Sequence, residues 1–151
     1  MERENDFDGA IAIYEQLYEK DSSSLVIANN LASMLATYKD DQISLEKASR
    51  VARRLKGTTV PPFQDTYGWI LFRNGNFDEA LTYLEPAANG LAGDPIVQFH
   101  LGKTYQALGR DDDARAAFQR ASDIASQDDP RDQIAEARDF LARPANSASD
   151  Q

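Results

Sequence analysis

Residues 95–128, PIVQFHLGKTYQALGRDDDARAAFQRASDIASQD, repeat the order of residue types found in residues 61–94, PPFQDTYGWILFRNGNFDEALTYLEPAANGLAGD. Six positions match at an offset of 34 residues: Pro61 with Pro95, Gly68 with Gly102, Gly75 with Gly109, Ala80 with Ala114, Leu84 with Phe118, and Ala87 with Ala121. Self-similarity at a fixed spacing of about 20–50 residues is the sequence signature of repeat proteins. The sequence therefore predicts stacked copies of one small structural unit.

Each unit begins with a proline, continues with a stretch of helical apolar periodicity, turns at a glycine, and ends with a second such stretch. This order predicts two antiparallel helices of about a dozen residues each. Gly75 and Gly109 follow the first helix, where a left-handed residue ends a helix at little cost. Gly68 and Gly102 lie in the middle of the first helix, where glycine costs about 1 kcal/mol relative to alanine. We expect close approach of a neighbouring helix to offset that cost.

The pattern extends in both directions from the two clear units. Ala32 occupies the position of Gly68, and Phe7 and Ala10 match Phe77 and Ala80 of a second helix. We therefore expect a single solenoid over residues 1–143 and a flexible tail at 144–151. Its predicted parts are an unpaired second helix at 5–22, repeats at 24–58, 61–94 and 95–128, and a capping helix at 130–143.

The composition argues against several classes of function. The 151 residues include no cysteine and one histidine, so most zinc and Ser-His-Asp chemistry is not expected. Sixteen basic and twenty-five acidic residues give a formal charge of -9, which repels nucleic acid and anionic lipid. No apolar run reaches the length of a membrane span. We expect no catalytic residue, metal or cofactor, no nucleic-acid partner and no direct membrane insertion.

These repeats resemble the tetratricopeptide repeat family. The residues that carry the resemblance in the last full unit are Leu101, Gly102, Tyr105, Ala114, Phe118 and Ala121, at the family's spacing. The family's first-helix tryptophan is replaced by Ala28, Gln64 and Gln98. The resemblance covers roughly residues 5–142 and implies an all-α, right-handed superhelix of antiparallel helix pairs.

A second resemblance concerns the strings at residues 29–32, 65–69 and 99–102. They are similar to the C-terminal repeats of bacterial tetratricopeptide proteins of exopolysaccharide and exosortase export systems. This similarity implies part of a cell-envelope or export-system protein. The expected compartment is the cytoplasm if the chain is complete, and the periplasm or envelope if it is a fragment of a longer exported protein.

The tetratricopeptide resemblance also implies a concave groove that binds a peptide or helix of a partner protein. Transfer of the family's geometry predicts these groove residues: Asn29, Ser33, Asp65, Trp69, Phe72, Arg73, Phe99, Lys103 and Gln106. Trp69 either anchors a ligand or packs between neighbouring first helices. We expect a non-catalytic interaction scaffold, with binding centred on Trp69, Phe72 and Phe99.

Two other surfaces offer different functions. Lys47, Arg50 and Arg54 share one helical face and form a basic stripe, which is either a solvated face or a docking patch for an acidic partner. The apolar stripe of the first helix consists of Phe7, Ile11, Tyr14, Leu17 and Tyr18. We expect this stripe to lack cover, which would favour self-association into a homo-oligomer.

Overall fold

The computed structural model describes residues 2–144, with side chains described from residue 6 onward. The helices are α1 (Glu2–Lys20), α2 (Leu25–Tyr38), α3 (Gln42–Ala52), the short 3-10 helix η1 (Arg53–Leu55), α4 (Pro61–Arg73), α5 (Phe77–Gly90), α6 (Pro95–Ala107), α7 (Asp111–Ile124) and α8 (Asp132–Ala142). The described residues contain no strand, and the prediction of an all-α solenoid is confirmed. Residues 145–151 of the predicted tail lie outside this range.

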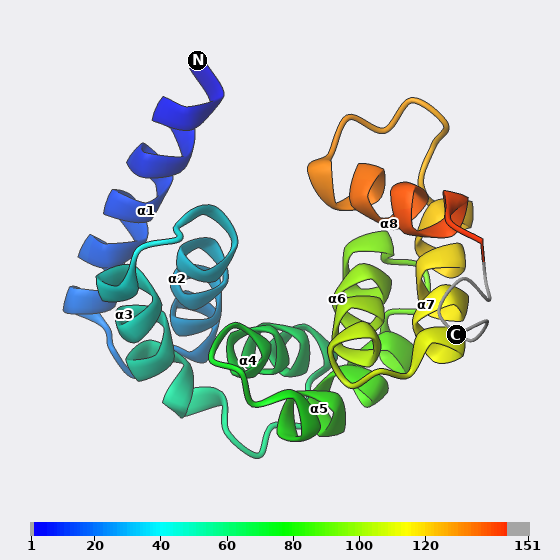
Figure 1. Cartoon of the computed structure of the whole chain (residues 1–151). Helices are drawn as coiled ribbons and strands as arrows, with labels where there is room; N and C mark the ends of the chain where they lie inside the picture. Colours follow the sequence, from blue (N-terminus) through cyan, green and yellow to red (C-terminus); the bar gives the residue numbers. More distant parts are fainter. Residues whose placement is uncertain (1, 145–151) are drawn as a thin grey trace.

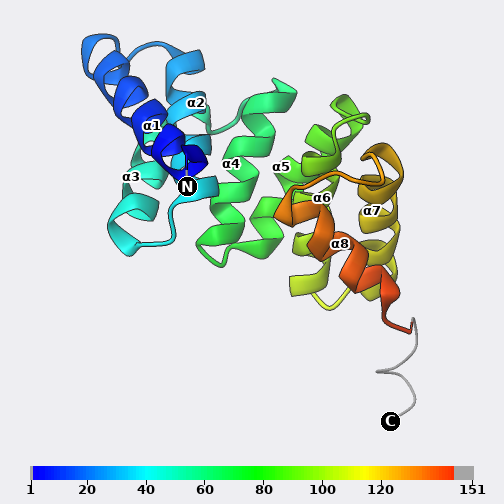
Figure 2. The same ribbon diagram turned by 90° about the horizontal axis from the view of Figure 1, so that it is seen from above.

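The helices form a curved array (Figure 1). Helices α2, α4 and α6 line its inner side, while α3, α5 and α7 form its outer side. The chain passes from an inner to an outer helix in each hairpin, and α1 and α8 stand at the two ends. Figure 2 shows the same order from above, with successive hairpins stacked side by side.

Local signals start and stop the helices. The side chains of Ser24, Asp41 and Asp94 accept hydrogen bonds from backbone N–H groups in the first turns of α2, α3 and α6, which satisfies donors that a helix start leaves free. Gly75 and Gly109 have φ angles of 85° and 75°, in the left-handed region that glycine adopts most easily. They end α4 and α6 and turn the chain into the outer helix.

The hairpins interlock through small and large residues. At Gly102 an added Cβ would lie 2.6 Å from Cε1 of Phe118, and at Gly68 it would lie 2.7 Å from Cγ of Leu84. The inner and outer helices of both hairpins therefore approach so closely that only glycine fits. This contact explains why a residue that weakens a helix stands at its centre.

The core runs along the whole array. One cluster is built mainly on α5, α6 and α7, and the other on α2 and α3. Tyr67 and Trp69 of α4 pack against both clusters. Because α4 joins the two clusters, each hairpin depends on its neighbours for burial of its apolar surface, as expected for a solenoid.

Candidate functional site

The concave side contains two adjoining pockets. The larger, about 590 Å³, includes Phe7 of α1, Ser33 of α2, Asp65 of α4 and residues 130–133 before and within α8. The smaller, about 400 Å³, is lined by Trp69, Phe72, Phe99 and Lys103 together with residues of α2 and α8. Thr37, His100, Asp132 and Gln133 belong to both pockets, so they form one continuous groove.

Trp69 is the centre of an aromatic cluster in this groove. Its ring is nearly parallel to that of Phe72, one turn later on α4, with centroids 4.6 Å apart and an interplanar angle of 7°. It also stacks on the His100 ring of α6 at 4.0 Å and 18°. Phe99 lies 6.2 Å from Trp69 in a tilted arrangement. Trp69 is half-buried, so it both packs between inner helices and lines the groove.

His100 is held by a contact between repeats. Its Nδ1 lies 2.7 Å from Oδ1 of Asp65, and its side chain is only 7% exposed. Because an ionised carboxylate only accepts hydrogen bonds, this distance fits an Nδ1–H group that donates to Asp65. The contact fixes the ring against Trp69 and links α4 to α6. The sequence position of His100 favours a hydrogen-bonded residue between helices over a ligand-binding one, but it does not identify Asp65, 35 residues away, as the partner.

The two predicted groove cations are paired within the protein. Arg73 donates hydrogen bonds to the backbone oxygens of Ala36 and Lys39 at the end of α2, and its guanidinium lies 3.4 Å from the exposed Asp40. Cations at this end of a helix are favoured by unpaired carbonyls and by the helix dipole. Nζ of Lys103 lies 2.5 Å from Oε2 of Glu136 on α8. A ligand would have to share or displace these partners to use either charge.

The other predicted groove residues differ in position. Ser33 lines the larger pocket, whereas Asn29 and Gln106 line neither of the two pockets. The Nδ2 group of Asn29 contacts Oδ1 of Asn30 at 3.4 Å, and its own Oδ1 is buried without a partner among the described residues. These two residues are therefore not brought together with Trp69.

The wall formed by the start of α8 was not among the predicted groove residues. Asp129 accepts hydrogen bonds from the backbone and guanidinium of Arg131, and this pairing holds the pKa of the Asp129 carboxyl at about 2. These hydrogen bonds between Arg131 and Asp129 fix the turn before α8, which places Asp132, Gln133 and Glu136 against the groove.

The predicted basic patch holds α1 in place. Nζ of Lys47 lies 2.6 Å from Oε1 of Glu15, and Nε of Arg54 donates to the hydroxyl of Tyr18 at 3.0 Å. The Arg54 guanidinium also lies 5.6 Å from the centre of the Tyr18 ring. Arg50 of α3 is exposed. Lys47 of α3 and Arg54 of η1 thus connect these two helices to α1.

The expectation that the apolar stripe of α1 lacks cover is wrong for most of its residues. Ile11 is only 5% exposed, and Tyr14 and Tyr18 pack against the core of α2 and α3. Phe7 stacks on Tyr38 with ring centroids 3.7 Å apart. Leu17, at 40% exposure, is the member of the stripe that stays open. The following hairpin supplies the cover that sequence reasoning assigned to a missing helix.

Among the described residues, no group of three histidine, aspartate or glutamate side chains is placed to hold a metal ion. Within the same range, none of the helices has the combined length and apolarity of a membrane span. The groove instead presents rigid aromatic surface with polar side chains at its edges.

A curved stack of helical hairpins with an aromatic inner groove defines the class of helical repeat solenoids. The tetratricopeptide repeat model matches residues 71–138. This match over residues 71–138 supports the resemblance to the tetratricopeptide repeat family. No curated protein sequence matches it significantly.

Solved structures show the same fold. A thermophilic tetratricopeptide protein of Thermus thermophilus is similar with a TM-score of 0.65 and 22% identity, over 89% of this chain and 73% of that one. MamA is similar with a TM-score of 0.62 and 18% identity, over 93% and 87% of the two chains. The fold is that of a protein–protein interaction scaffold, in which the curved stack provides an extended binding surface.

Proposed function

We propose that this protein is a non-catalytic scaffold that binds a peptide or helix of a partner protein in the concave groove, with an apolar or aromatic anchor of the ligand against Trp69. The observation that carries the proposal is the half-buried Trp69, stacked on Phe72 and His100 beside a pocket of about 400 Å³. Tryptophan is enriched among residues that dominate binding energy.

Pre-organisation supports the same conclusion. The contact between His100 and Asp65 and the stacking on Phe72 hold Trp69 before any ligand arrives. A ligand therefore loses little free energy to ordering of the protein, although ordering a flexible peptide still reduces the net affinity. We expect affinities on the order of micromolar, a free energy of about -8 kcal/mol.

The test uses the fact that Trp69 is the only tryptophan of the chain. Twelve-residue peptides selected from a random display library against the full chain are titrated while tryptophan fluorescence is recorded. Binding in the groove should change the emission of Trp69. Trp69→Ala should weaken binding, measured by calorimetry, by about 30-fold or more, because loss of a dominant anchor costs about 2 kcal/mol.

Ile43→Ala is the control, since Ile43 is 78% exposed and lies outside the groove. It should bind the selected peptides with unchanged affinity. Peptides that bind Trp69→Ala as tightly as the parent chain, without any change in the parent's emission, would contradict the proposal.

Two alternatives from the sequence stay predictions. Self-assembly through α1 has less support because its apolar stripe is largely covered by α2 and α3. A role in a cell-envelope export system depends on sequence resemblance alone. The groove proposal requires neither of them.

A further inference from the structure

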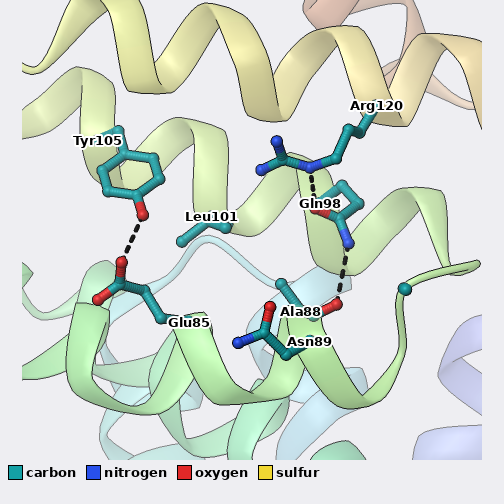
Figure 3. A pocket seen from close by; sticks show the side chains of 8 residues that line it. Glu85, Ala88, Asn89, Gln98, Leu101, Tyr105 and Arg120 are labelled. Carbon is teal, nitrogen blue, oxygen red and sulfur yellow. Dashed lines mark hydrogen bonds between the residues drawn. The ribbon is translucent and has the colours of Figure 1, made fainter.

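A third pocket lies on a different side of α6 from the groove (Figure 3). It has a volume of about 340 Å³ and lies between α5, α6 and α7. Its α6 residues are Gln98, Leu101 and Tyr105, whereas the groove uses Phe99 and Lys103. At about 100° of rotation per residue, these two sets point to nearly opposite sides of the helix.

Hydrogen bonds fix the two ends of this pocket. At one end, Nε2 of the buried Gln98 donates to the Ala88 carbonyl at 3.1 Å, and its Oε1 accepts from Nε of Arg120 at 3.0 Å. At the other end, the hydroxyl of Tyr105 donates to Oε2 of Glu85 at 2.6 Å. Figure 3 shows the two pairs on either side of Leu101.

Each pair leaves groups available to a ligand. Within residues 6–144, Arg120 uses only its Nε in a hydrogen bond and Glu85 accepts only at Oε2. Both residues are exposed. The pocket therefore offers guanidinium donors and a carboxylate acceptor around an apolar surface formed by Ala88 and Leu101.

In the preceding repeat, tyrosine rings occupy the positions that correspond to Leu101 and Ala117. Tyr67 and Tyr83 precede Leu101 and Ala117 by 34 residues. The two tyrosine rings pack edge to face, with centroids 4.7 Å apart, and the hydroxyl of Tyr83 accepts a hydrogen bond from the backbone N–H of Gly57 at 2.9 Å. Leucine and alanine at the later positions remove both phenol rings from the α5–α6–α7 interface.

We propose that this pocket binds a tyrosine side chain of a partner polypeptide. The ring would lie against Leu101, at a position comparable to that of the tyrosine rings in the preceding interface. A phenol hydroxyl can donate a hydrogen bond to Oε1 of Glu85, the carboxylate oxygen that Tyr105 does not use. Phenylalanine lacks this hydroxyl, and leucine lacks both the ring and the hydroxyl. A volume of about 340 Å³ is at the small end of the range for ligand pockets.

The probe is N-acetyl-L-tyrosinamide, titrated into the ¹⁵N-labelled full chain and followed by amide chemical shifts. We expect saturable shifts at residues 85–92 and 98–105, with a dissociation constant on the order of millimolar, as suits a single side chain. N-acetyl-L-phenylalaninamide should bind several-fold more weakly, and N-acetyl-L-leucinamide more weakly still. Non-saturable shifts, shifts centred on Trp69, or equal binding of the phenylalanine probe would overturn the proposal.

Two variants test the site without depending on one another. Leu101→Tyr restores the ring of the preceding repeat and should fill the pocket, with about tenfold or greater loss of tyrosinamide binding. Asn89→Trp places a large ring on the exposed rim and should have the same effect if the first variant does not fold. Ile43→Ala is the control on a distant surface. If both pocket variants, folded by circular dichroism, bind the probe like the control, the proposal is wrong.

Discussion

Gly102→Ala tests the close helix contact on which the stacked hairpins depend. The new Cβ would lie 2.6 Å from Cε1, 2.7 Å from Cδ1 and 3.0 Å from Cζ of Phe118. Optimal carbon–carbon contacts are about 3.5 Å or longer, so the ring would have to move by roughly 1 Å. Phe118 is only 1% exposed and packs against Phe99 and Phe140 at centroid distances of 6.0 and 4.9 Å. The ring has little space for that movement.

The expected loss of stability is a balance of two effects. Alanine gains about 1 kcal/mol over glycine inside a helix. Overpacking of a buried site typically costs about 1–3 kcal/mol, and a rigid ring enclosed by two others should lie at the upper end. The net destabilisation is therefore about 1–2 kcal/mol. For a chain of this size, that corresponds to a decrease in Tm of about 2–8 °C.

Thermal and urea unfolding followed by circular dichroism provide the measurement. Gly9→Ala is the matched control, since Gly9 also lies inside a helix but has no atom within 4 Å of an added Cβ. It should stabilise the protein by about 0.5–1 kcal/mol. Phe118→Leu should cost less in the Gly102→Ala background than alone, because the smaller side chain relieves the clash. If Gly102→Ala raises the Tm as Gly9→Ala does, the inferred helix contact is wrong.

Three further predictions concern charges and buried polar groups. Burial and the hydrogen bond to Glu85 raise the pKa of Tyr105 to about 12. The neutral phenol therefore adds up to about 2–3 kcal/mol to the free energy of unfolding below pH 10. This contribution is lost as the pH rises toward 12. Alkaline unfolding with Tyr105→Phe as control checks this, and an equally steep loss in both proteins would contradict it. Arg73→Ala should lower the free energy of unfolding in urea by about 1–2 kcal/mol, because it leaves carbonyls at the end of α2 without a hydrogen-bond donor. A change no larger than that of Ile43→Ala would count against this role of Arg73. Lys47→Ala should lower the free energy of unfolding by less than about 1 kcal/mol, and by less still at high salt, because the ion pair of Lys47 with Glu15 is partly exposed. A large loss of stability that does not depend on salt would refute this estimate.

The fold could be predicted because its signals are local. Gly75 turns the chain within one hairpin. Gly102 and Phe118 contact each other across the two helices of another hairpin. Such relations recur at fixed spacing in the sequence. The repeat offset alone therefore brings them to notice, without knowledge of how hairpins stack.

The site was less predictable because its contacts join different hairpins. His100 with Asp65, Lys103 with Glu136, and Arg73 with the end of α2 are separated by more than 30 residues. Their meeting depends on the curvature of the array, which spacing does not specify. The same cause explains the error on α1, where α2 covers a stripe that the sequence left without a partner.

The internal pairing of cations affects which partner the groove suits. Arg73 and Lys103 in the groove, and Lys47 and Arg54 outside it, all contact groups within the protein. The chain nevertheless carries a formal charge of -9, and Asp40 at the groove edge has a fully exposed side chain. An acidic ligand would meet a negative field with no unengaged cation among these four side chains to offset it. We therefore expect peptides selected on the groove to combine an aromatic or apolar anchor with basic residues, and to bind more weakly as salt increases. Selection of acidic peptides would show that Arg73 or Lys103 exchanges its internal partner for the ligand.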